Sequence, residues 1–186
     1  LGDVYKRQDY NSRLAYQLKI TPEIFYLDVQ SGVKLVRYIE GAETLNNATI
    51  QYMNHIEKVI MVLRTLHTSG VRFNNDFNVF KEIEIYEELL GRVKGWMYEG
   101  YSELRPSIFA LADRLNQLGV TLTPCHNDLV AENFVKGLDG KIHLIDWEYS
   151  GMNDPLWDLA ALFIESSFSE ENLQRALLLY LSLIHI

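Results

Sequence analysis

Three polar side chains in the last third of the chain have the types and spacing of a phosphoryl-transfer site. Asp128 and Asn133 lie in the run PCHNDLVAENF, where His126 completes an H-x-D-x-x-x-x-N pattern, and Asp146 follows the apolar run HLI. Transfer of a phosphoryl group from a nucleotide needs a carboxylate that aims the acceptor hydroxyl, and an amide and a second carboxylate that hold Mg²⁺. We assign Asp128 to the first task, and Asn133 with Asp146 to the second.

The segments around Asn133 and Asp146 are predicted to form a β-hairpin. Phe134-Val135 and the run from Ile142 to Ile145 are short and β-prone, and Asp139-Gly140 between them is a hairpin turn signal. A hairpin brings the two residues at its open end close together, where their oxygen atoms could share one cation. The alternative is that the three polar residues only cap a turn and end a strand.

Aromatic and acidic side chains crowd the segment that follows Asp146. A quaternary ammonium group donates no hydrogen bonds, so it is recognised by aromatic faces and nearby negative charge, each face contributing roughly 0.5–2 kcal/mol. A cationic alcohol is therefore a candidate substrate, and ordinary core packing is the alternative for each aromatic residue. The candidate substrate-binding residues are Trp147, Glu148, Tyr149 and Trp157.

The catalytic segment resembles the kinase-like small-molecule phosphotransferases, which include aminoglycoside phosphotransferases and choline/ethanolamine kinases. The runs PCHNDLVAENF and LIDWEYSGMNDPLWDLAALFIE are most similar to bacterial choline kinases, and the likeness extends from Asp9 to Tyr180. Ala131 departs from the pattern, since proline is expected there. The resemblance implies an α+β, protein-kinase-like fold with a mostly helical C-lobe and a catalytic-loop hairpin. It also implies ATP and Mg²⁺ as cofactors and phosphorylation of choline to phosphocholine.

The same resemblance implies roles for residues outside the central motif. The segment 36–40 corresponds to the hinge between two lobes, so backbone groups of Tyr38 and Ile39 would meet the adenine. His126 would orient the catalytic loop rather than exchange protons. Asp158 would support that loop by bonding its backbone.

The start of the chain lacks parts that a kinase-like enzyme uses. Nothing before Pro22 supplies the glycine-rich loop or the strand lysine that hold the triphosphate. We therefore expect an N-terminally truncated fragment with negligible turnover by itself. Residues 9–40 are expected to be a remnant of the N-lobe sheet and hinge, and residues 41–181 the helical C-lobe. The segments 1–8 and 182–186 read as foreign ends.

Composition narrows the partners. With 25 acidic and 17 basic residues the net charge is −8, which disfavours nucleic acid. The single cysteine, Cys125, rules out an internal disulfide and fits a reducing cytoplasm. No signal peptide is visible, and no run reaches the roughly 20 apolar residues of a membrane span. We expect a cytoplasmic protein that binds ATP and a small molecule without membrane insertion, and the oligomeric state stays open.

Residue periodicity predicts the elements that position these groups. On the last predicted helix, which Asp154 caps and Pro155 begins, the buried face is expected to hold Leu156, Leu159, Ala160 and Phe163, with Asp158 pointing away from it. The predicted elements are helices over residues 10–19, 50–66, 82–90, 106–118 and from 155 onward, and strands over residues 24–28 and 33–39.

Three hypotheses about function remain. The first is a choline kinase, and the second is a kinase of another amino alcohol or an aminoglycoside on the same fold. Aromatic crowding around Asp128 argues against aminoglycosides, which should need an open acidic groove. The third is a non-catalytic choline-binding module, which would have no need for all three of Asp128, Asn133 and Asp146.

Overall fold

The computed structural model describes residues 2–182, with side chains from residue 8 onward. Residue 1 and residues 183–186 lie outside the described part, and so does most of the predicted foreign C-terminal end. The chain divides into two compact units, one formed by residues 1–76 together with 122–186 and the other by residues 77–121. The predicted lobe boundary between residues 40 and 41 is a different division, and it stays a prediction.

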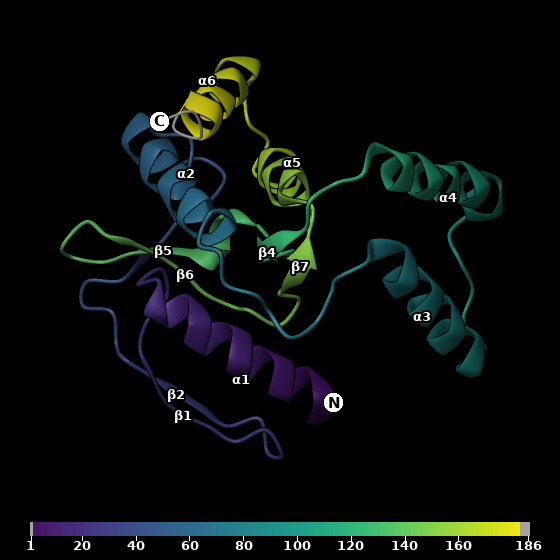
Figure 1. The fold of residues 1–186 in the computed structure, drawn as a ribbon, viewed down its shortest axis with the longest axis horizontal. Coiled ribbons are helices and arrows are strands. Elements are labelled where there is room, and N and C mark those ends of the chain that lie inside the picture. The colour runs from purple at the N-terminus through teal and green to yellow at the C-terminus, as the bar shows by residue number, and fades with distance from the viewer. Residues whose placement is uncertain (1, 183–186) are drawn as a thin grey trace. The chain divides into compact units, whose positions relative to one another are not determined.

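A helix and a hairpin open the first unit (Figure 1). They are α1 (Gly2–Gln17), β1 (Ile24–Leu27) and β2 (Lys34–Val36). The two strands pair antiparallel, and the carboxylate of Asp28 caps their turn by accepting from the backbone amide of Gln30 at 3.0 Å. The predicted helix and hairpin are confirmed, although the helix begins before residue 10.

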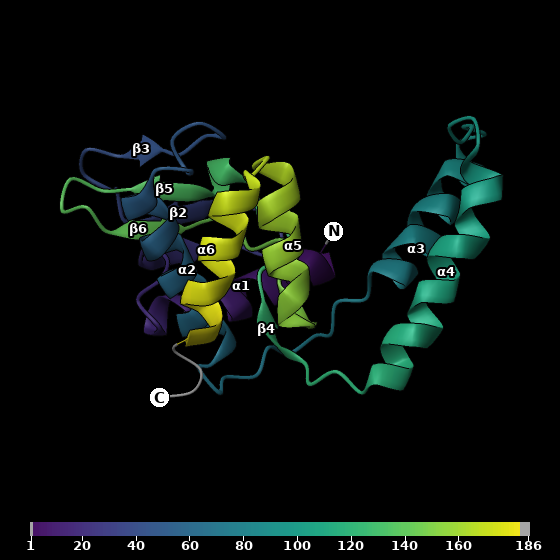
Figure 2. The ribbon, with the colours of Figure 1, turned by 90° about the horizontal axis from the view of Figure 1, so that it is seen from above.

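Helix α2 (Met53–His67) forms the centre of the first unit. Its apolar residues recur at helical spacing, so one face is continuously buried. That face packs against α6 (Glu170–Ser182) and against the strands β4 (Thr123–Cys125) and β6 (Ile142–Leu144). Figure 2 shows α6 alongside α2, with α5 (Pro155–Glu165) next to it. The helix predicted over residues 50–66 is confirmed.

Two small sheets hold the segments that carry the motif. β5 (Phe134–Lys136) pairs with β6 and with the short β3 (Glu43–Thr44), while β4 pairs with β7 (Gly151–Asn153). In the β5–β6 hairpin Phe134 lies opposite Leu144, and Gly140 in its turn has a φ of 74°, which glycine adopts without strain. This is the predicted hairpin, whereas β3, β4 and β7 were not predicted.

Helix α5 (Pro155–Glu165) begins as its sequence predicts. The Asp154 side chain accepts from the backbone amide of Leu156 at 2.8 Å, and Pro155 occupies the first turn. The predicted buried face is partly wrong, because Leu156 and Ala160 are exposed. The face that meets the core consists of Asp158, Leu159, Leu162 and Phe163.

The second unit is a pair of helices, α3 (Val79–Arg92) and α4 (Tyr101–Leu118). The carboxylate of Glu87 accepts from the Arg105 guanidinium at 2.5 and 2.8 Å and from the Tyr101 hydroxyl at 2.6 Å. These hydrogen bonds, that of Arg105 first, lower the pKa of Glu87 to about 2. The prediction that Pro106 stands near the helix start is wrong, since α4 begins five residues earlier. A proline inside a helix removes one backbone hydrogen bond, and α4 tolerates that loss.

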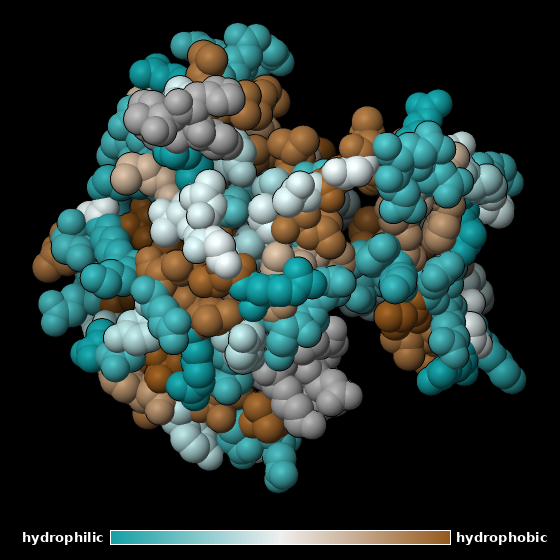
Figure 3. All heavy atoms as spheres, in the orientation of Figure 1, coloured by the Kyte–Doolittle hydropathy of each residue, from teal (hydrophilic) through white to brown (hydrophobic). Residues whose placement is uncertain are grey.

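The surface mixes polar and apolar residues, as Figure 3 shows for one face. Among the residues that the structure describes, no helix is both long and apolar enough to cross a membrane.

Candidate active site

The backbone of the loop that contains the H-x-D motif is held by one buried carboxylate. Asp158 on α5 accepts hydrogen bonds from the backbone amides of His126 at 2.8 Å and Asn127 at 2.7 Å. A third bond, of 3.0 Å, joins it to Nε2 of His67 on α2. The expectation that Asp158 points away from the buried face of α5 is wrong, because its side chain is fully buried. Three donors offset the desolvation of its charge.

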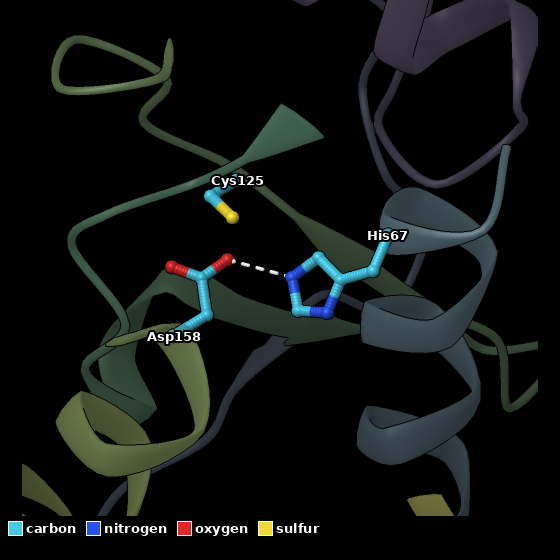
Figure 4. Close-up of side chains that lie close together, drawn as sticks. All are labelled: His67, Cys125 and Asp158. Carbon is cyan, nitrogen blue, oxygen red and sulfur yellow. Dashed lines mark hydrogen bonds and ion pairs between the residues drawn. The ribbon is translucent and has the colours of Figure 1, made fainter. Parts of the chain in front are cut away.

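Asp158 also lies beside Cys125, and with His67 the two form a compact buried group (Figure 4). One potential ligand atom from each residue lies within 4.8 Å of the others, which a metal site also requires. However, the carboxylate is already engaged by two backbone amides and a histidine. Burial, followed by the charge of Asp158, raises the pKa of the Cys125 thiol, so the sulfur stays protonated. We therefore interpret the group as a scaffold under the loop.

The structure brings Asp128 and Asn133 together, next to Ile145, the residue before Asp146. Nδ2 of Asn133 donates to the backbone carbonyl of Asp128 at 2.8 Å and lies 3.4 Å from its Oδ2. The backbone carbonyl of Asn133 accepts from the amide of Ile145 at 2.9 Å, which fixes the residue directly before Asp146. The 3-10 turn Ala131–Asn133 leads into β5 and sets this register.

The backbone is strained at two positions of this site. Asn127 has a φ of 69° and Asp146 a φ of 64°, and both are among the five non-glycine residues with positive φ in the described chain. Such conformations cost roughly 1–3 kcal/mol each and persist where surrounding contacts impose them, often at functional sites. The strain turns the chain sharply next to Asp128 and at Asp146 itself.

His126 lies fully buried behind these carboxylates. One ring nitrogen, Nε2, lies 2.8 Å from the carbonyl of Ile145, and the ring packs edge-on against Trp147 with centroids 4.9 Å apart. Burial lowers the pKa of His126, and it outweighs the opposing charges of Asp158, Asp128 and Asp146. A neutral ring that donates from Nε2 ties the loop to the strand end before Asp146.

Asn127 connects the loop to the aromatic segment, and sequence analysis did not single it out. Its Nδ2 donates to the backbone carbonyl of Tyr149 at 3.0 Å, and its own carbonyl accepts from Nε1 of Trp157 at 3.3 Å. Its Oδ1 accepts from the side-chain Nδ2 of Asn153 at 2.9 Å. The sequence signal that could have indicated this role is the residue type, because asparagine is enriched in left-handed conformations.

The four aromatic and acidic candidates occupy different environments. Trp147 is fully buried, and its Nε1 donates to the carbonyl of Leu144 at 3.1 Å, so it belongs to the core and we do not carry it into a substrate pocket. Tyr149 is 36% exposed, Trp157 is partly buried and Glu148 is exposed. Tyr149 and Trp157 are held near the loop by the contacts of Asn127.

Negative charge accumulates around Glu148. Its pKa is raised, first by partial desolvation and then by the charges of Asp146 and Asp128. Three carboxylates within electrostatic range of one another favour the binding of cations.

The predicted hinge residues lie in a separate cleft. Tyr38 is 80% exposed and Ile39 is partly buried, and the carbonyl of Glu40 accepts from the amide of Leu138 in the hairpin turn at 2.8 Å. A cleft of about 630 Å³ is lined by the segment 37–40 and by the hairpin turn, but not by Asp128. The structure therefore does not place Tyr38 and Ile39 beside the three motif residues.

The donor set of the motif fits Mg²⁺. Because Nδ2 of Asn133 bonds the backbone of Asp128, the orientation of the amide leaves its Oδ1 as the atom for a ligand. Asp146 is exposed and supplies a carboxylate. Oxygen atoms of this kind, completed by water and phosphate, are what Mg²⁺ prefers.

Comparisons with solved structures define the class of fold. The choline kinase LicA from Streptococcus pneumoniae is 39% identical with a TM-score of 0.87, covering 95% of this chain and 61% of that one. A structure of LicA in complex with AMP is also 39% identical, with a TM-score of 0.86, and covers 95% of this chain and 60% of that one. The ADP-bound aminoglycoside phosphotransferase APH(2'')-Ib is 16% identical with a TM-score of 0.70, covering 96% of this chain and 67% of that one. At this identity the similarity shows the fold alone. The fold is α+β and protein-kinase-like, as predicted.

Sequence comparison narrows this class to one family. The family model for choline/ethanolamine kinases matches residues 17–175, so the chain belongs to the choline/ethanolamine kinase family. Protein LicA of Haemophilus influenzae is 38% identical over 164 residues, which are 87% of this chain and 60% of that protein. The chain thus spans about half to three fifths of the length of the first two curated relatives it matches. The predicted family is confirmed.

Proposed function

We propose that this chain is part of an ATP-dependent kinase that phosphorylates the hydroxyl group of choline. The observation that carries the proposal is the junction of Asp128 and Asn133, with a 2.8 Å bond between them, beside the segment of Asp146. Family membership and the similarity to a structure titled as a choline kinase support the same reaction. The AMP in a similar LicA structure supports an adenine nucleotide as the second substrate.

In the proposed reaction Asp128 accepts the hydrogen bond of the choline hydroxyl and aims its oxygen at the γ-phosphorus of ATP. A bond forms between that oxygen and phosphorus, the bond from phosphorus to the β,γ-bridging oxygen breaks, and the hydroxyl proton passes to Asp128. Asn133 and Asp146 would hold Mg²⁺, which neutralises charge on the phosphate oxygens when bound. His126 and Asp158 keep the loop in place without touching the substrates.

The cation of the substrate is proposed to lie among Trp157, Tyr149 and Glu148. A trimethylammonium group forms no hydrogen bonds, so aromatic faces and carboxylates are its natural partners. The carboxylates of Asp128, Asp146 and Glu148 supply the negative charge. Tyr38 and Ile39 stay proposed as backbone contacts of the adenine.

The test is a panel of alcohols offered to the complete gene product with ATP and Mg²⁺. We expect choline to be phosphorylated with a kcat/KM well above that of ethanolamine or an aminoglycoside. Preference for ethanolamine would replace the substrate but keep the reaction. Binding of choline without phosphorylation of any alcohol would overturn the kinase proposal in favour of a binding module.

A further inference from the structure

Asn11 on α1 is a fully buried asparagine far from the motif in sequence. Its Nδ2 lies 3.0 Å from Oγ of Ser150, 3.1 Å from the backbone carbonyl of Ser150 and 2.9 Å from Oδ1 of Asn75. The amide has two hydrogens, so it can satisfy two of these acceptors at once or share them. One side chain therefore joins α1 to two segments that come 64 and 139 residues later.

Ser150 closes the turn that starts directly after Asp146. Its backbone amide and its hydroxyl both donate to the carbonyl of Trp147, at 3.2 and 2.6 Å. Asp146, with its strained φ, directly precedes the turn, and Glu148 lies within the turn. Whatever fixes Ser150 therefore also limits where the Asp146 and Glu148 side chains can point.

The other attachments of this turn come from nearby segments. Trp147 is buried in the core, and Asn127 of the catalytic loop donates to the carbonyl of Tyr149. Nδ2 of Asn75 donates to the carbonyl of Ser150 at 2.9 Å, and the backbone carbonyl of Asn75 accepts from the amide of Met152 in β7 at 2.8 Å. The contact from Asn11 differs because it comes from a helix, α1, whereas Asn75 and Asn127 both lie in loops.

We propose that Asn11 is a positioning residue of the phosphotransfer site, which holds the turn 147–150 through Ser150 so that Asp146 is presented to the cation. The inference rests on the proposed role of Asp146 as a metal ligand. The contact couples α1 to the site, so a displacement of this helix would change the position of Asp146. Such an arrangement accounts for a polar side chain in the interior of the unit, where an apolar one of similar size would also pack.

Ser12 offers a matched control. It is the next residue on α1 and equally buried, but its hydroxyl donates only to the Gln8 carbonyl of the same helix, at 2.5 Å. Asn11→Ala and Ser12→Ala thus disturb the same helix, and only the first removes a contact to the turn.

Hydrogen exchange on the 186-residue chain tests the link directly. We expect Asn11→Ala to speed exchange of the amides between residues 147 and 152 by about tenfold or more, while Ser12→Ala leaves them unchanged. Exchange in this segment at the wild-type rate in Asn11→Ala overturns the inference. If Asn11→Ala does not fold, Asn11→Leu, which removes the amide but fills its space, is judged by the same criterion.

The affinity for Mn²⁺, measured by water-proton relaxation, tests whether the Asn11 contact affects the metal site. Asn11→Ala is expected to weaken Mn²⁺ binding by about tenfold, the scale seen when residues that orient metal ligands are removed. Equal Mn²⁺ affinity in wild type and Asn11→Ala would contradict the inference. In the complete gene product, a wild type that phosphorylates no alcohol would instead defeat the proposed function, so the two failures are distinguishable.

Discussion

Nε2 of His67 on α2 lies 3.0 Å from Oδ2 of Asp158 on α5, and both side chains are buried. The other nitrogen of the ring, Nδ1, lies 2.8 Å from the hydroxyl of Tyr180 on α6. Since Asp158 also holds the amides of His126 and Asn127, three helices are joined under the catalytic loop through His67 and Asp158. The loop is therefore positioned from the core of the unit as well as by the hydrogen bonds within it.

Removal of the Asp158 carboxylate should destabilise the protein strongly. Asp158→Ala leaves two backbone amides and His67 without their acceptor, and we expect the free energy of unfolding to fall by roughly 3–5 kcal/mol. The measurement is denaturant unfolding. Asp154→Ala on the same helix is the control, because it removes a single cap bond to Leu156 and should cost about 1 kcal/mol. Equal losses for the two variants would contradict the scaffold role of Asp158.

Substitution of Asp128 should remove chemistry and spare the fold. In the complete gene product, Asp128→Ala is expected to lower kcat for choline by about 10²–10⁴-fold, the usual scale for a group that handles a proton. Glu132→Ala, an exposed carboxylate of the same loop, should leave kcat near the wild-type value. A wild-type rate in Asp128→Ala would take that residue out of the mechanism.

Two substitutions distinguish the contribution of the Trp157 aromatic ring from that of its hydrogen bond. Trp157→Ala should raise the KM for choline about 2- to 30-fold, which corresponds to a loss of 0.5–2 kcal/mol, and should spare the KM for ATP. Trp157→Phe keeps an aromatic face but loses the bond from Nε1 to the Asn127 carbonyl. If the face binds the cation, the phenylalanine variant should recover most of the affinity for choline. A phenylalanine variant as impaired as the alanine one would assign the effect to the Asn127 contact.

Local features of the fold could be predicted from the sequence. The hairpin that carries Asn133 and Asp146 is specified by adjacent residues, because two β-prone runs flank an Asp-Gly turn. The start of α5 follows from Asp154 and Pro155 in the same way. Each of these signals acts over a few residues, so no knowledge of the tertiary structure is needed to interpret it.

Contacts over long distances in sequence could not be predicted. Periodicity gives the angles between residues on α5, but not which side of the helix meets the core, and Asp158 was consequently placed on the wrong side. The roles of Asn127 and Asn11 depend on partners that only the fold brings near. Trp147 illustrates the same limit, since its aromatic type suits both a cation pocket and the core position that it occupies.

His126 should stay neutral at pH values where a free histidine is protonated. Burial lowers its pKa in the folded state, so the unfolded chain binds the proton more tightly. Its contribution to stability is present above the unfolded pKa of about 6.5 and is lost as the pH falls towards the folded value. Ring ¹⁵N chemical shifts across a pH titration provide the measurement, and we expect a neutral ring protonated at Nε2. Titration of this ring with an ordinary pKa would contradict its complete burial.

Glu148 provides a test of the carboxylate cluster that does not depend on turnover. Its pKa is raised by partial desolvation and by the charges of Asp146 and Asp128, so the folded state binds this proton more tightly than the unfolded chain. Stability from this source is present below the unfolded pKa and is lost as the pH rises through the folded pKa. Carbon NMR of the side-chain carboxyl should show the raised pKa falling part of the way back in Asp146→Asn, because desolvation, the larger cause, remains. In Asp139→Asn, which removes an exposed carboxylate of the hairpin turn, it should stay raised. The same response to both substitutions would mean that overall negative charge, and not the proximity of Asp146, sets the pKa of Glu148.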